Sequence, residues 1–246
     1  MAIKIAFANF KGGSGKTISS IATASILASK GYEVLFVDCD KQGYASERLK
    51  ACADGPNIYD IFFDGCTARE CIQEAEYVDI ISCGGTFFGI DDKVSCGPES
   101  HYYLKKALAS VEDEYDFVIF DTPPYEDILF VNAIMATDYV LIPFDTSTIS
   151  CLSIKNTCEV IEEYQRENVN LKIVGAFGFK DFERDKQYDE MVKNISKNIP
   201  ILPSVILDME DNRFLDEGKR VMAGSNETNI ERKSNKLINE ILEEIE

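Results

Sequence analysis

A glycine-rich stretch near the start of the chain, GGSG at residues 12–15, runs directly into Lys16 and Thr17. The apolar run IKIAFANF precedes it at residues 3–10, and a helix-like segment follows from residue 16 to residue 30. Glycine allows a backbone to curl so that its N–H groups converge, and the first turn of a helix adds the positive end of its dipole. A strand, a glycine-rich turn and a helix in this order predict a phosphate-binding loop within an α/β fold.

The stretch departs from the common phosphate-loop pattern, GxxxxGK[ST], at one position. The pattern requires glycine at position 10, where this chain has Phe10, and an additional lysine, Lys11, precedes the glycines. Lys16 is expected to reach the β- and γ-phosphates of a nucleotide, and the Thr17 hydroxyl is expected to bind Mg²⁺. The alternative is a glycine-rich turn with two incidental lysines, and the position between strand and helix argues against it.

Apolar runs alternate with helix-like segments along the rest of the chain. Strands are expected at 33–38, 77–82, 117–122, 139–144 and 171–179, with a weaker edge strand at 201–206. Helices are expected at 99–112, 127–137, 148–168, 187–198 and 228–245, and capping boxes are expected at 67–70 and 228–231. This order predicts a single domain over residues 1–246, with a mostly parallel twisted sheet flanked by helices on both faces.

Acidic residues stand at the ends of two predicted strands. Asp121 closes the strand in FVIFDTPP, and Asp38 and Asp40 close the strand in VDCDKQG. Alternate residues of a strand face the same way, so the carboxylates at 38 and 40 can approach one metal–phosphate site. We expect one of them to join the Mg²⁺ shell and the other to orient the attacking water, while Asp121 holds Mg²⁺ through water.

The segments KGGSGKT, VDCDKQG, FVIFDTPP and VNAIMATDYVLIPF together resemble the ParA/MinD family of deviant Walker A ATPases. The resemblance covers nearly the whole chain and is strongest to small, Soj-like ParA partition ATPases that lack an N-terminal DNA-binding extension. It implies an ATP hydrolase that forms a homodimer with two ATP molecules and Mg²⁺ enclosed between its subunits. In that arrangement Lys11 reaches across the interface to the nucleotide of the other subunit.

The resemblance also implies a role for each site residue. It assigns catalysis to Lys11, Lys16 and Asp40, of which Asp40 positions the water, and it places Gln42 in the first switch loop. The expected nucleotide-binding residues are Lys11, Gly12, Gly13, Ser14, Gly15, Lys16, Thr17 and Ile18, and the expected metal-shell residues are Thr17, Asp38 and Asp121.

Three residues depart from the family pattern. They are Ser14 in place of valine, Ile18 in place of threonine, and Lys41 in place of proline. We expect them to affect the rate or the switch motion, and not phosphate binding. Candidate adenine contacts are the segments 178–182 and 204–209.

The implied role is a molecular switch in plasmid or chromosome partition. A basic ParB-like partner would stimulate hydrolysis, and the ATP state would bind DNA non-specifically. The DNA candidates are Arg213, Lys219 and Arg220, and the alternative for them is a solvated surface of mixed charge. The net charge of −18 argues against indiscriminate binding to polyanions and favours a basic partner.

Two other functional classes stay open. One is a MinD-like or other positioning ATPase whose cargo is a protein complex, and the other is a metabolic or redox P-loop enzyme similar to the nitrogenase iron protein. The C-terminal segment carries glutamates in its last turns, so we expect it to pack on the sheet and not on a membrane. The eight cysteines form no C-x-x-C pair and the chain has one histidine, which favours reduced thiols in a cytoplasmic protein, nucleoid-associated if it binds DNA.

Overall fold

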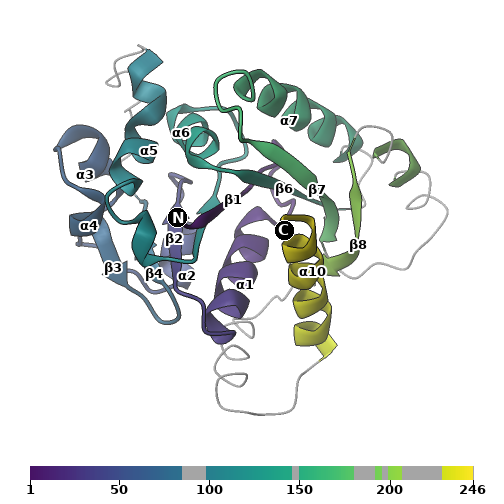
Figure 1. The fold of residues 1–246 in the computed structure, drawn as a ribbon, viewed down its shortest axis with the longest axis horizontal. Helices are drawn as coiled ribbons and strands as arrows, with labels where there is room; N and C mark the ends of the chain where they lie inside the picture. The colour runs from purple at the N-terminus through teal and green to yellow at the C-terminus, as the bar shows by residue number, and fades with distance from the viewer. Residues whose placement is uncertain (85–97, 146–149, 180–191, 196–198, 207–228, 246) are drawn as a thin grey trace.

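The computed structural model describes residues 1–84, 98–145, 150–179, 192–195, 199–206 and 229–245. One eight-stranded sheet crosses the molecule (Figure 1). In sheet order its strands are β3 (Ile72–Glu74), β4 (Asp79–Ile81), β2 (Val34–Asp38), β5 (Phe117–Asp121), β1 (Ile3–Phe7), β6 (Tyr139–Phe144), β7 (Lys172–Phe179) and β8 (Ile201–Ile206). Neighbouring strands pair in parallel, except that β3 is antiparallel to β4.

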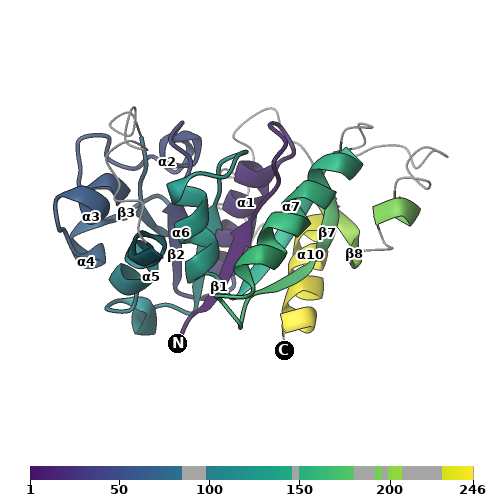
Figure 2. The ribbon, with the colours of Figure 1, turned by 90° about the horizontal axis from the view of Figure 1, so that it is seen from above.

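Helices cover both faces of the sheet. One face carries α1 (Lys16–Ser29), α2 (Tyr44–Arg48) and α10 (Asn229–Ile245). The other carries α3 (Ile58–Phe63), α4 (Ala68–Cys71), α5 (Tyr103–Leu108), α6 (Ile128–Ala136) and α7 (Ser150–Tyr164). Figure 2 shows both chain termini on the side of the molecule where β1 begins, opposite the side where β1 runs into the glycine-rich loop.

A separate apolar cluster is buried on each face of the sheet, and the residues of β1 and of the position after it contribute to both clusters. Ile5 and Phe7 belong to the cluster beneath α1 and α10, whereas Ala6 and Ala8 belong to the cluster beneath α6 and α7. Successive strand residues point to opposite faces, so a strand covered on both sides must be apolar throughout. The two clusters hold the sheet between its layers of helices. Polar side chains are therefore expected at the carboxyl ends of the strands, where the helices do not cover the sheet.

The structure confirms the predicted fold class and the predicted strands, to within a few residues at their ends. The strand predicted at 201–206 is the edge strand β8, and Thr67 and Glu70 form the predicted capping box. In α10, the side chains of Leu237, Ile238 and Ile241 are buried against the sheet, which confirms that this helix packs on the protein. None of the helices in the described ranges is long and apolar enough to cross a membrane.

Other predicted elements differ from the structure. The helix predicted at 99–112 is divided into a 3-10 turn at 98–102, α5, and a second 3-10 turn at 112–114. The Ser110 hydroxyl donates to the carbonyl oxygen of Ala107 at 2.9 Å where α5 ends, and such a bond competes with helix continuation. The sequence predicts α4 only through its capping box, and it does not predict α2, α3 or β3, which are too short for a periodic pattern to develop. Of the helix predicted at 187–198 the structure describes residues 192–195 as helical, and the capping box at 228–231 begins outside the described residues.

Candidate nucleotide-binding site

The glycine-rich loop is anchored at its start by polar contacts to two other elements. The Asn9 side-chain amide donates to the carbonyl oxygen of Pro143 in β6 at 2.8 Å, and its oxygen accepts from the Lys11 backbone at 3.0 Å. The Phe10 backbone N–H donates to the Thr157 hydroxyl of α7 at 3.0 Å, and its ring centroid lies 5.0 Å from that of Phe130. Phe10, which replaces the glycine of the common pattern, therefore ties the loop to the core beneath α6 and α7.

Two glycines of the loop take backbone conformations that other residues rarely adopt. Gly13 and Gly15 have φ angles of 72° and 93°, and Gly15 is the N-cap of α1. A Cβ atom at position 15 would clash with the ring of Phe179. Glycine is needed at this position both for its φ angle and for the close approach of Phe179.

The Lys16 side chain is buried at the first turn of α1. The residue is 6% exposed, and its Nζ lies 3.3 Å from the Lys11 carbonyl oxygen. Burial lowers the pKa of the Lys16 ammonium, while the nearby carboxylates of Asp121 and Asp40 oppose this change. A buried cation at a helix N-terminus, next to a loop of backbone N–H groups, is the arrangement that binds a phosphate group.

A cavity of about 480 Å³ opens in front of this loop. Its lining includes every predicted nucleotide-binding residue from Gly12 to Ile18, together with Asp40 and Gln42. Phe179, from the candidate adenine segment 178–182, also lines it. The remaining lining residues, which the sequence analysis missed, are Tyr44, Pro124 and Tyr125. Tyr44 and Tyr125 are large exposed side chains, and exposure is a signal that a sequence alone does not carry.

Asp38 and Asp121 lie in register on the neighbouring strands β2 and β5, and both are buried. Asp38 is surrounded by donors from the loop that follows β2. Its Oδ1 accepts from the Asp40 backbone at 3.0 Å, and its Oδ2 accepts from the Ser46 backbone at 2.9 Å and the Ser46 hydroxyl at 2.7 Å. Burial raises the pKa of Asp38 to about 6, and the hydrogen bonds from Ser46 and Asp40 oppose this rise.

Asp121 differs, because neither of its carboxylate oxygens accepts a hydrogen bond of normal geometry from the part of the chain that the structure describes. Burial, and after it the charge of Asp38, raise the pKa of Asp121 to about 8, while the nearby Thr17 hydroxyl and the Lys16 ammonium oppose the rise. A buried carboxylate without donors is costly unless a cation compensates it. Magnesium prefers oxygen ligands, so Asp121 and Thr17 fit a Mg²⁺ ion that also binds phosphate oxygens.

Asp40 lies at the cavity itself and is half-buried. Its Oδ1 accepts from the Gln42 backbone at 3.0 Å, and its backbone carbonyl accepts from Gly43 at 2.8 Å. These bonds fold residues 40–43 into a tight turn that presents the Asp40 side chain to the cavity. The position suits a residue that orients water near a phosphate group.

Lys11 does not line this cavity. Its Nζ forms an ion pair with Oδ2 of Asp145, which follows β6, and the two side chains are 17% and 23% exposed. The structure therefore separates the two lysines of the loop: Lys16 belongs to the cavity of its own chain, and Lys11 lies at the rim. Asp145 was not singled out by the sequence analysis.

The other candidates are distributed differently. The DNA candidates Arg213, Lys219 and Arg220, as well as Cys96, lie outside the described residues. The seven cysteines in the described part of the chain are free thiols. Within the described ranges, no group of three or more His, Cys, Asp or Glu side chains could hold a metal ion, so a Mg²⁺ ion at Asp121 would take most of its ligands from water and phosphate oxygens.

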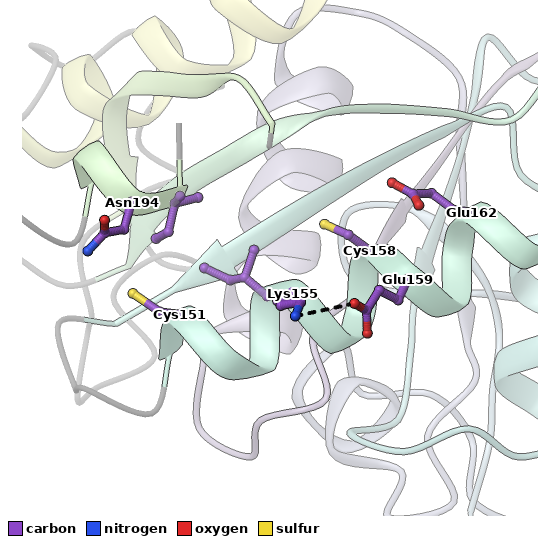
Figure 3. Close-up of a pocket in the computed structure, with 8 residues that line it drawn as sticks. Cys151, Lys155, Cys158, Glu159, Glu162 and Asn194 are labelled. Carbon is purple, nitrogen blue, oxygen red and sulfur yellow. Dashed lines mark ion pairs between the residues drawn. The ribbon is translucent and has the colours of Figure 1, made fainter. Parts of the chain in front are cut away.

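A second hollow, of about 550 Å³, lies between α7 and residues 192–195 (Figure 3). Its wall includes Cys151, Cys158 and Lys155, and the Lys155 Nζ lies 3.6 Å from Oε1 of Glu159. Burial raises the pKa of Cys151, and it raises the pKa of Cys158 to about 11. Both thiols are protonated at neutral pH and are poor nucleophiles.

A family model described as "AAA domain" matches residues 2–173, which is more than half of the chain. The chromosome-partitioning ATPase Soj of Treponema pallidum is 30% identical over 200 residues, covering 78% of this chain and 77% of that protein. The chain therefore belongs to this family of P-loop domains, and within it to the ParA/MinD type. The resemblance read from the sequence motifs is confirmed.

Two further proteins with related sequence or fold differ in their recorded roles. The maintenance of carboxysome distribution protein A of Synechococcus elongatus is 23% identical over 245 residues, covering 90% of this chain and 92% of that protein. A crystal structure of a plasmid partition protein from Borrelia burgdorferi B31, bound to AMPPNP, superimposes with a TM-score of 0.81. It is 21% identical, covers 98% of both chains, and confirms the fold.

Proposed function

We propose that this chain is a Mg²⁺-dependent ATPase that acts as a molecular switch, forming a dimer with ATP and separating after hydrolysis. One observation carries the proposal: the buried ammonium of Lys16 lies near the buried carboxyl group of Asp121, whose oxygens accept no hydrogen bond of normal geometry from the described residues. Each is unfavourable in an empty protein, and each becomes favourable when a phosphate and a divalent cation are bound together.

The residues of the site divide the work of ATP hydrolysis. The backbone N–H groups of residues 12–17 and the Lys16 ammonium bind the phosphates, and Thr17 and Asp121 hold the cation. Mg²⁺, when bound, neutralises charge that develops on the phosphate oxygens. Asp40 orients the water that attacks the terminal phosphate, and Asp38 holds the loop that carries Asp40.

Dimerisation depends on Lys11. This lysine stands outside the cavity of its own loop and pairs with Asp145, so its charge can exchange that partner for a phosphate of a second subunit. A cation supplied from a second chain makes the phosphate charge part of the interface. ATP then favours the dimer by mass action, and loss of the terminal phosphate weakens it.

The proposed cargo is DNA, in plasmid or chromosome partition. The relative from Treponema pallidum is named a chromosome-partitioning ATPase, and this supports the same role here. Arg213, Lys219 and Arg220 are the proposed DNA contacts in the dimer. A basic, ParB-like partner would be attracted by the net charge of −18 and would stimulate hydrolysis.

A protein complex is the second candidate cargo. The relative from Synechococcus elongatus, named for carboxysome distribution, and the strongly acidic composition favour this alternative. The two cargoes separate in a filter-binding assay with and without ATP, over a series of salt concentrations. Retention of DNA that needs ATP and falls steeply with salt supports partition, whereas equal or absent retention in both states leaves the protein-complex cargo.

Nucleotide binding itself is tested by Lys16→Ala. Loss of the buried ammonium should weaken binding of a fluorescent ATP analogue at least about 100-fold, which corresponds to ~2.7 kcal/mol. Lys105→Ala, which changes an exposed lysine on α5, is the control and should bind as the unmodified protein does. Equal affinity in the Lys16→Ala protein would overturn the assignment of the phosphate site.

A further inference from the structure

A buried ion pair connects the two loops that carry the acidic residues of the site. The Nζ of Lys41 lies 3.0 Å from Oδ2 of Asp127, and their side chains are 10% and 6% exposed. Lys41 directly follows Asp40 in the loop after β2. Asp127 ends the loop that leads from β5, whose last residue is Asp121, into α6.

Asp127 has a second task in the same place. Its Oδ1 accepts hydrogen bonds from the backbone of Leu129 at 3.1 Å and of Phe130 at 2.9 Å, which makes it the N-cap of α6. One oxygen therefore fixes Asp127 to the helix, and the other faces Lys41. Because a capped helix end is rigid, Lys41 is held against a fixed point of the fold.

On the other side, Lys41 is the next residue after Asp40 and lies within the tight turn that Asp40 forms with Gln42 and Gly43. Burial excludes water from the pair, so the attraction between its charges is much stronger than on the surface. A small displacement of this turn moves the Asp40 carboxylate relative to the phosphate site. Displacements of about 1 Å at a reacting group can lower a rate about 100-fold.

We propose that the Lys41–Asp127 ion pair is a positioning device that fixes Asp40 against the loop that follows Asp121 and so sets the rate of ATP hydrolysis. The rate effect rests on the proposed function, whereas the fixing of the turn does not. Lys41 stands where the resembled family commonly has proline, a residue with a restricted backbone and no charge. In this chain an ion pair restrains the turn instead.

A double-substitution cycle separates positioning from folding. Lys41→Met alone leaves a buried carboxylate without its cation, and it should lower the melting temperature by about 10 °C. The Lys41→Met/Asp127→Asn protein removes both charges while the introduced amide oxygen still caps α6, so its melting temperature should return to within about 3 °C of the unmodified protein. Its kcat for MgATP should nevertheless stay about tenfold below normal, with KM changed less than about twofold.

The matched control is Lys106→Met, which removes the exposed ion pair between Lys106 of α5 and Glu99 of the 3-10 turn at 98–102 and should leave kcat and KM unchanged. A double variant with full stability and full kcat would overturn the proposal, because the pair would then serve folding alone. If the double variant does not fold, Asp127→Asn alone decides, since it keeps the cap and should show the same loss of kcat.

A nucleotide-free measurement distinguishes failure of this inference from failure of the proposed function. In Asp127→Asn, hydrogen exchange of the Gln42 and Gly43 amides, both bonded to Asp40, should accelerate at least tenfold. The Ala8 amide, which donates to Leu141 at 3.0 Å, serves as the internal reference and should not change. Unchanged exchange at residues 42 and 43 would overturn the positioning role even if the protein hydrolyses ATP. If exchange accelerates in Asp127→Asn but the unmodified protein does not hydrolyse ATP, the positioning role stands and the proposed function is contradicted.

Discussion

The ends of β2 and β5 carry two buried aspartates in the same register, yet the chain treats them in opposite ways. Asp38, at the end of β2, accepts three hydrogen bonds from Ser46 and Asp40. Asp121, at the end of β5, accepts none of normal geometry from the described residues. The pKa of each is raised chiefly by burial, to about 6 for Asp38 and about 8 for Asp121.

The difference indicates two tasks. A carboxylate whose lone pairs are used by the protein organises a loop, and a carboxylate whose lone pairs are unused is reserved for a ligand. The resemblance assigned both residues to the metal shell. The contacts favour Asp121 as the residue near Mg²⁺ and Asp38 as the residue that shapes the loop around Asp40.

The largest expected effect is on catalysis by Asp121→Asn. Loss of the carboxylate should lower kcat for MgATP by about 100-fold, because the cation loses its protein-derived negative charge. The measurement is steady-state hydrolysis over a Mg²⁺ titration, with Asp38→Asn as the matched control. Asp38→Asn should retain more activity, and equal losses in both variants would break the comparison.

The next effect is on stability, and here Asp38→Asn should have the larger effect of the two substitutions. Asp38→Asn places an amide group among donors that need an acceptor, so the free energy of unfolding should fall by about 2–3 kcal/mol. Asp121→Asn replaces a buried carboxyl group whose charged form is disfavoured by burial, so the nucleotide-free protein should be as stable or more stable. Urea unfolding without nucleotide measures both, and a larger loss for Asp121→Asn would contradict the assignment.

The dependence of stability on pH follows from the same two residues. Both folded-state pKa values lie above the unfolded value of about 3.9, so the folded protein binds more protons between the two values. The free energy of unfolding of the nucleotide-free protein should therefore fall, by up to about 5 kcal/mol, as pH rises from 5 to 8. Asp121→Asn should remove most of the slope above pH 6, and an unchanged slope in that variant would contradict the raised pKa of Asp121.

The smallest effect is expected for Ser46→Ala, which removes one of the three hydrogen bonds to Asp38. The free energy of unfolding should fall by about 1 kcal/mol. The backbone bond from residue 46 remains, so ATP hydrolysis should change less than it does in Asp38→Asn. Urea unfolding and steady-state kinetics check both points, and a loss as large as that of Asp38→Asn would show that the hydroxyl alone holds the carboxylate.

The sequence was sufficient for the parallel strands of the sheet and for most of the phosphate cavity. Parallel strands buried on both faces produce continuous apolar runs, and a phosphate loop is a local motif, so both features are visible in short windows. The lining from Gly12 to Ile18, and Asp40 beside it, follow from that local pattern.

Contacts between distant segments could not be predicted in the same way. Ser46 holds Asp38 from eight residues further along, after a glycine turn that no periodicity marks. Asp145 pairs with Lys11, and Asp127 pairs with Lys41, only because neighbouring strands bring their following loops together. The aromatic side chains at positions 44 and 125 reach the cavity for the same reason.

The central claim is that ATP joins two copies of this chain through Lys11. The most direct test is the mass of the protein in solution with ADP and with a non-hydrolysable ATP analogue, for the unmodified protein and for Lys11→Ala. The account predicts one chain with ADP, two chains with the analogue, and a Lys11→Ala protein that binds the analogue but stays a single chain. A mass that is the same in every nucleotide state, or a Lys11→Ala protein that dimerises at normal strength, would contradict it.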